Sequence, residues 1–163
     1  MESTLLVVDA STLLNFLNVR RFDLIHSLGF KVRIVDAVYE EVASEREQLD
    51  QFVEAGSIRQ LTLEGESLTG NVAKLLSLGL GRGEAFSFAA AIEFEAVIAI
   101  DDRRAIKRAQ PVVAGLTIVT TPDIVISGVR KVRITVAEAD LLKEEWAEMH
   151  KFHLKFSSFR ELI

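Results

Sequence analysis

Acidic residues stand directly after short apolar runs at three places in this sequence. Asp9, Asp36 and the pair Asp101-Asp102 each follow such a run. Carboxylates that meet in space repel one another, and a divalent cation bound between them relieves that repulsion. Oxygen ligands select hard cations such as Mg²⁺ or Mn²⁺. The three positions together indicate a cation site, although each Asp alone could cap the next helix. We keep the cap interpretation for Asp36.

Two glutamates are candidates to join these aspartates. Glu40 and Glu41 are neighbours on a predicted helix, so only one of them can face the site. We prefer Glu41, which lies three residues after Val38 and near the helix face that Val38 defines, and we expect Glu40 to be solvated. Glu84 opens an Ala-rich helix after a glycine-rich break. A first-turn acid is also favoured by the helix dipole alone, so that simpler interpretation stays open.

The apolar runs predict the elements that must bring these acids together. Continuous apolar strands that alternate with helices are typical of a parallel sheet covered on both faces. We predict an α/β fold, a three-layer α/β/α sandwich with a central parallel sheet of four or five strands and right-handed crossovers. The carboxyl ends of parallel strands share one edge, where ligands bind. The predicted strands are 5–8, 32–35, 58–63 (a short or edge strand), 97–100 and 116–119. The predicted helices are 11–19, 22–28, 37–44, 46–55, 67–78, 84–95, 103–109, 122–129 and 136–150.

Length and composition limit the class of protein. The 163 residues suggest one domain, 1–163, with 130–163 as a helical extension at its C-terminal end. The chain has no Cys and only three His, which excludes thiolate metal sites and leaves mainly oxygen ligands. No secretion signal or apolar stretch long enough for a membrane span is evident, so we expect no membrane association and a cytoplasmic location. The net charge of −5 argues mildly against a protein that coats nucleic acid non-specifically.

The order of the motifs along the chain resembles the PIN-domain family, in particular its VapC-like prokaryotic ribonuclease toxins. The match runs from about residue 5 to residue 119, and the stretch 83–90 is its most distinctive part. The motifs that carry the resemblance are Val8-Asp9-Ala10-Ser11, Val38-Tyr39-Glu40-Glu41-Val42, Gly81-Arg82-Gly83-Glu84-Ala85 and Ile100-Asp101-Asp102-Arg103.

The resemblance implies roles for these acids. Asp9, Glu84 and Asp102 would bind the metal, with Asp101 close behind Asp102 as the fourth acid. Glu41 would complete the shell through water or position the attacking water. The resemblance further implies a supporting role for two polar residues, Ser11 and Asn15.

The same resemblance implies the activity and the partners. It predicts a PIN-like endoribonuclease that uses Mg²⁺ or Mn²⁺ to hydrolyse RNA phosphodiesters. It also implies that the protein is the toxin of a toxin–antitoxin pair, with an antitoxin as protein partner and a homodimer as assembly.

Contacts with a substrate are less well defined by the sequence. Arg82 and Arg103 flank the proposed site and could hold phosphates, although a solvated helix face carries such residues without any function. Trp146 is interpreted as packing rather than base stacking. The tail 152–163 could be a short helix on the body of the protein, and its apolar residues could be core or partner surface.

Two other functions stay open. The first is a non-catalytic or weakly active PIN-like binding or regulatory module. The second is an aspartate-based phosphotransferase with Asp9 as nucleophile, against which Ser11 stands where such folds usually have a second acid.

Overall fold

A five-stranded, all-parallel sheet forms the centre of the computed structural model, which describes residues 4–163. The strand order is β3-β2-β1-β4-β5, so β1 lies in the middle and β3 at one edge, as predicted for 58–63. The paired positions include Val7 with Arg33 in β2 and with Ile98 in β4. The strands are β1 (Leu5–Val8), β2 (Lys31–Val35), β3 (Ile58–Leu61), β4 (Val97–Ala99) and β5 (Ile118–Val119).

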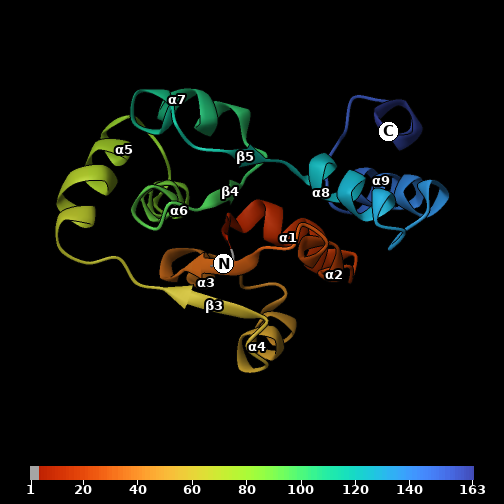
Figure 1. The fold of residues 1–163 in the computed structure, drawn as a ribbon, viewed down its shortest axis with the longest axis horizontal. Helices are drawn as coiled ribbons and strands as arrows, with labels where there is room; N and C mark the ends of the chain where they lie inside the picture. The colour runs from red at the N-terminus through yellow and green to blue at the C-terminus, as the bar shows by residue number, and fades with distance from the viewer. Residues whose placement is uncertain (1–3) are drawn as a thin grey trace.

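Helices cover both sides of the sheet, which confirms the predicted three-layer α/β/α arrangement. In Figure 1, α5, α6 and α7 lie on one side, and α1, α2, α8 and α9 lie on the other. The helix α6 packs on β1, β2 and β4. The helices are α1 (Ala10–Asn18), α2 (Asp23–His26), α3 (Asp36–Glu41), α4 (Arg46–Glu54), α5 (Ala73–Ser77), α6 (Arg82–Glu93), α7 (Arg103–Val113), α8 (Thr121–Arg130) and α9 (Val136–Met149), with a π-helical turn η1 (Leu68–Val72) and a 3₁₀ turn η2 (Phe159–Leu162).

The core explains why the strands read as unbroken apolar runs. Leu6, Val7 and Val8 of β1 are all fully buried, although successive side chains point to opposite faces of the sheet. Both faces are therefore covered. Ala89 and Ala90 of α6 are also fully buried, and their small side chains allow this helix to lie close to the sheet.

Three predicted elements differ in the structure. The helix predicted for 67–78 is divided into η1 and α5. The helix predicted for 103–109 continues through Pro111 to Val113, and Pro111 is exposed, so its ring projects toward solvent. The helix predicted for 122–129 begins one residue earlier, at Thr121, with Thr120 as its cap, whose hydroxyl accepts a hydrogen bond from the Asp123 N–H at 3.5 Å.

The C-terminal helices are anchored to the N-terminal part of the chain. Trp146 of α9 is fully buried, its Nε1 donates to the Asn15 carbonyl at 2.7 Å, and its ring meets Phe16 edge-on at 5.8 Å. The packing interpretation of Trp146 is therefore confirmed. The tail ends in η2, where Asp140 accepts a hydrogen bond from the Phe159 N–H at 2.9 Å and Phe159 is fully buried.

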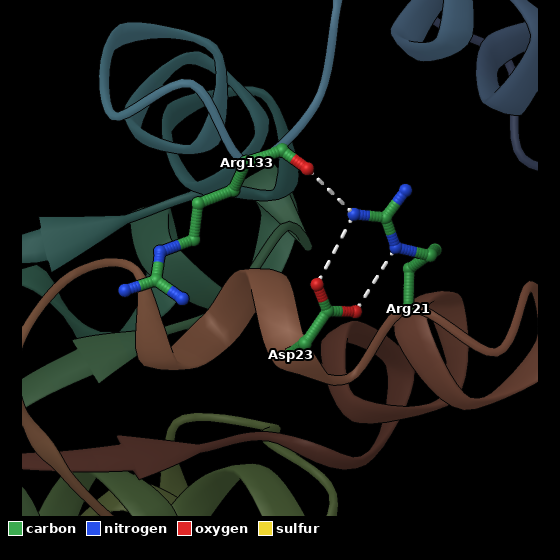
Figure 2. A network of polar contacts seen from close by, with 3 residues as sticks. All are labelled: Arg21, Asp23 and Arg133. Carbon is green, nitrogen blue, oxygen red and sulfur yellow. Dashed lines mark hydrogen bonds and ion pairs between the residues drawn. The ribbon is translucent and has the colours of Figure 1, made fainter.

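A surface ion pair adds a second link between the same regions. Arg21 contacts both carboxylate oxygens of Asp23, at 3.0 and 3.1 Å, and also donates to the Arg133 carbonyl at 3.0 Å (Figure 2). It thereby joins the start of α2 to the turn between α8 and α9. Among residues 4–163, no helix has the length and apolar character needed to cross a membrane.

Candidate active site

Asp9 is the most buried acid at the carboxyl edge of the sheet. It directly follows β1, is only 4% exposed, and accepts a hydrogen bond from the Ser11 hydroxyl at 3.1 Å. Burial and the negative charge of Glu84 raise the pKa of Asp9 from 3.8 to about 6, against the hydrogen bonds from Ser11 and from the Ala10 backbone. Asp9 stands at the cap position of α1, but its side chain makes no capping hydrogen bond. The Asp9 carboxylate is therefore not used as a helix cap.

Glu84 stands in the first turn of α6 and interacts with three other acids. Its carboxylate accepts a hydrogen bond from the Gly81 N–H at 2.9 Å, so it also supports the start of the helix. Burial raises the pKa of Glu84, the Gly81 hydrogen bond opposes this, and a hydrogen bond and charge from Asp102 raise it further, with a smaller effect from Glu41. Asp9, Glu41, Glu84 and Asp102 therefore lie within one electrostatic neighbourhood, which we call the acid cluster.

Glu41, the last residue of α3, reaches this neighbourhood by a hydrogen bond to α6. Its Oε1 accepts from the Gly83 N–H at 3.0 Å. A Cβ at position 83 would overlap the Glu41 carboxylate, and would lie 2.8 Å from its Cδ, so only glycine allows this approach. The neighbouring Glu40 is exposed and pairs with Arg82 at 2.7 Å. Glu40 is exposed, as expected, but Glu41 is exposed as well, so its hydrogen bond to α6, and not burial, distinguishes Glu41 from Glu40.

Asp102 both caps α7 and belongs to the acid cluster. Its Oδ1 accepts hydrogen bonds from the backbone N–H groups of Arg104 at 2.9 Å and Ala105 at 3.1 Å. One carboxylate oxygen suffices for the cap, so the cap and a role in the site are compatible. For Asp36 the cap prediction is wrong. Asp36 is the first residue of α3, makes no capping bond, and instead accepts from the Thr62 hydroxyl at 2.7 Å.

The Asp101 side chain belongs to a separate hydrogen-bond network. Its carboxylate accepts from the Thr12 hydroxyl at 2.7 Å, and from the N–H and hydroxyl of Thr121 at 2.9 and 2.6 Å. Asn15 donates to the Thr121 hydroxyl at 3.1 Å. We call these four residues the Asp101 network. It joins the ends of β4 and β5 to α1, and it gives Asn15 a structural partner.

Sequence reasoning missed Thr12 and Thr121. Both are fully buried polar residues, and Thr121 comes two residues after β5, close to the carboxyl end of that strand. That place at a strand end was the available signal.

The comparison with known proteins names the family. A family model described as a PIN domain matches residues 5–158. This chain belongs to the PIN-domain family. Proteins of the family are generally nucleases that typically use divalent metals. No curated protein matches the chain significantly.

The donor set of this PIN domain suits a hard cation. The acid cluster supplies only carboxylate oxygens, which Mg²⁺ and Mn²⁺ prefer, and burial together with the neighbouring acids raises the pKa of Asp9 and of Glu84. Within residues 4–163, no group of three or more His, Asp or Glu side chains is placed so that it could hold a metal ion. Glu41 and Glu84 instead hydrogen-bond to backbone N–H groups of the α6 start.

The two predicted substrate-binding arginines have different surroundings. The Arg82 guanidinium forms an ion pair with Glu40 and lies over the Phe86 ring, 5.1 Å from its centroid. It therefore already has partners on the protein surface. Arg103 is the first residue of α7, is exposed, and lines a cavity together with Asp101. A role in substrate binding stays a prediction for both residues.

Proposed function

We propose that this PIN domain is an endoribonuclease that hydrolyses RNA phosphodiesters with the help of Mg²⁺ or Mn²⁺. The observation that carries the proposal is that Asp9, Glu84 and Asp102 stand at the starts of three different helices, α1, α6 and α7, with Glu84 close enough to the other two for their charges to act on one another. Hydrogen-bonded helix caps alone would not require these acids to share one neighbourhood, because capping satisfies each carboxylate locally.

The residues of the acid cluster have different roles in the proposed metal site. Asp9, Glu84 and Asp102 are the proposed ligands, and Ser11 orients the Asp9 carboxylate through its hydrogen bond. Glu41 is held against α6 by Gly83, at a place from which it can accept a hydrogen bond from the attacking water. A bound Mg²⁺ or Mn²⁺ would lower the pKa of a water and stabilise negative charge on phosphate oxygens. No side chain has to act as nucleophile.

Cleavage of a labelled single-stranded RNA tests the proposal. We expect cleavage by the wild-type protein with Mn²⁺, loss of cleavage with EDTA, and a loss of roughly 10²- to 10³-fold in Asp9→Asn. Asp36→Asn is the matched control, since Asp36 also follows a strand but bonds to Thr62 outside the acid cluster. Equal cleavage by wild type and Asp9→Asn would remove the assignment.

A measurement without activity separates a nuclease from a binding module. Saturating Mn²⁺ should raise the free energy of unfolding of the wild type by about 2.7 kcal/mol at a hundred times the dissociation constant. Asp9→Asn should respond much less, because it lacks one ligand and one negative charge. A wild-type protein indifferent to Mn²⁺ would contradict the metal site itself.

We further propose that the protein acts in the cytoplasm as a VapC-like toxin, as a homodimer neutralised by an antitoxin. This part of the proposal rests on the resemblance of the motifs around Asp9 and Glu84. Induced expression of the wild type should arrest growth of a bacterial host, whereas Asp9→Asn should not. Arrest by both proteins would show that toxicity does not come from the acid cluster.

A further inference from the structure

A cavity of about 400 Å³ adjoins the acid cluster on the side of α7 and α8. It lies between the first turn of α7, the start of α8 and the extended segment 152–156 after α9. Asp101 and Arg103 line it, and Asp102 of the acid cluster stands between these two residues in the chain. A molecule in this cavity would therefore lie beside the proposed cleavage site.

The walls of the cavity are apolar and aromatic. Ile106 and Pro122 contribute from the helices, and Phe152, Leu154 and Phe156 contribute from the segment 152–156. Each of the two rings packs edge-on against a buried aromatic ring, Phe152 against Trp146 at 5.7 Å and Phe156 against Phe159 at 4.9 Å between ring centroids. Rings packed in this way offer a surface on which a flat base can stack.

Basic side chains surround the opening. Arg103, His153 and Lys155 are exposed and line the cavity. Among the described residues that line the cavity, Asp101 is the only acid, and its carboxylate already accepts hydrogen bonds from Thr12 and Thr121. The cavity thus combines an apolar interior with a cationic opening, which complements a nucleobase and its phosphate.

We propose that this cavity binds one base of the single-stranded RNA substrate, next to the phosphodiester that the acid cluster cleaves. The inference rests on the proposed function. Phe152 and Phe156 stack on the base, and Lys155 and Arg103 contact the flanking phosphates. RNA is favoured over a peptide because the exposed side chains of Arg103 and Lys155 are cations and because the cavity adjoins the site where a phosphodiester would react.

Binding of RNA without cleavage provides the first test. The background variant is Asp9→Asn, and the probe is a fluorescent single-stranded oligonucleotide followed by anisotropy. Adding Lys155→Ala or Phe156→Leu should weaken binding by about tenfold. Lys74→Ala is the control, since Lys74 is an exposed lysine on α5 outside the cavity. Unchanged affinity in both cavity variants would overturn the proposal, and unfolding curves identify any variant that fails to fold.

A missing base provides the second test, in the protein with intact Asp9. Phe156→Leu should raise KM for an oligonucleotide, but should change KM much less for the same oligonucleotide with an abasic residue in place of the base beside the cleavage point, because that substrate has no base to fill the cavity. In the wild type, the abasic substrate should show the raised KM of the variant. An equal loss on both substrates would contradict base binding in the cavity but would leave the nuclease assignment intact.

Loss of binding to a partner protein with unchanged RNA affinity would assign the cavity to that partner and overturn the RNA assignment. An inactive wild type would contradict the nuclease, whereas the anisotropy test of the cavity would still stand.

Discussion

Asp101 and Asp102 are neighbours in the chain, yet the two residues belong to regions of opposite character. The Asp101 network pairs its carboxylate with three donor groups from Thr12 and Thr121. The acid cluster instead gathers Asp102 with Glu84 and Asp9, and burial together with charge repulsion raises the pKa of Asp9 and of Glu84. One region is satisfied within the protein, and the other is left with an excess of negative charge.

The difference teaches which acids hold the fold and which are available for chemistry. A buried carboxylate that is fully hydrogen-bonded stabilises the native state and has little capacity left for a cation. Carboxylates that destabilise one another persist when an activity requires them, so perturbed groups gather at functional sites. Asp101 therefore fits a structural role, and Asp102 is the acid that we propose as a metal ligand. Four measurements sharpen or break this comparison.

The largest effect is expected from Asp102→Asn. Asn caps helices about as well as Asp, so α7 should keep its start and the free energy of unfolding should change by less than about 1 kcal/mol. RNA cleavage should fall by roughly 10²- to 10³-fold, because a ligand of the metal loses its charge. Cleavage assays and urea unfolding on the same preparation check both expectations. Full activity would place Asp102 among the purely structural caps.

The pH dependence of stability should report the burial of Asp9. In the unfolded chain Asp9 releases its proton near its ordinary pKa of 3.8, whereas in the folded protein it holds the proton up to about 6. The folded protein binds more protons in this window, so the free energy of unfolding falls as pH rises from 3.8 to about 6, by about 3 kcal/mol. The raised pKa of Glu84 acts in the same direction.

Urea unfolding in EDTA measures this effect. Asp9→Asn should gain stability relative to the wild type as pH rises through the window, since Asn carries no proton to lose. A difference between the two proteins that stays constant with pH would show that Asp9 is not perturbed.

A smaller effect, on stability alone, is expected from Asp101→Asn. The amide can still accept from the Thr121 N–H, but its NH₂ group replaces the oxygen that accepts from the hydroxyls of Thr12 and Thr121. The free energy of unfolding should fall by about 1 to 3 kcal/mol. Cleavage by the folded protein should stay within about tenfold of the wild type. A larger loss of cleavage with unchanged stability would instead make Asp101 a ligand.

The smallest effect is expected from Arg82→Gln. The Glu40–Arg82 pair is more than half exposed on both sides, and exposed pairs contribute less than about 1 kcal/mol. Stability should therefore change little, and thermal unfolding at two salt concentrations checks this. If KM for RNA rises several-fold, Arg82 exchanges Glu40 for a phosphate when substrate binds, and an unchanged KM would remove it from substrate binding.

Local patterns were sufficient to predict most of the fold and the members of the acid cluster. Val7 and Val8 belong to a run buried on both faces, and such runs are readable without tertiary contacts. Thr12 and Thr121 were not predicted, because a buried Thr has no sequence pattern that separates it from a surface Thr. The cap role predicted for Asp36 was wrong because its hydrogen-bond partner, Thr62, lies directly after β3, far from Asp36 in the sequence.

The sequence by itself determined that Asp9 and Asp102 would stand at one edge of a parallel sheet. Apolar strands fix where each chain segment leaves the core, and parallel strands leave it on the same side. Only the tertiary structure decided that Asp101 turns to Thr12 while Asp102 turns to Glu84, and that the segment 152–156 closes a cavity beside them. Those outcomes depend on side-chain partners distant along the chain, and local propensity carries no information about which partner will be within reach.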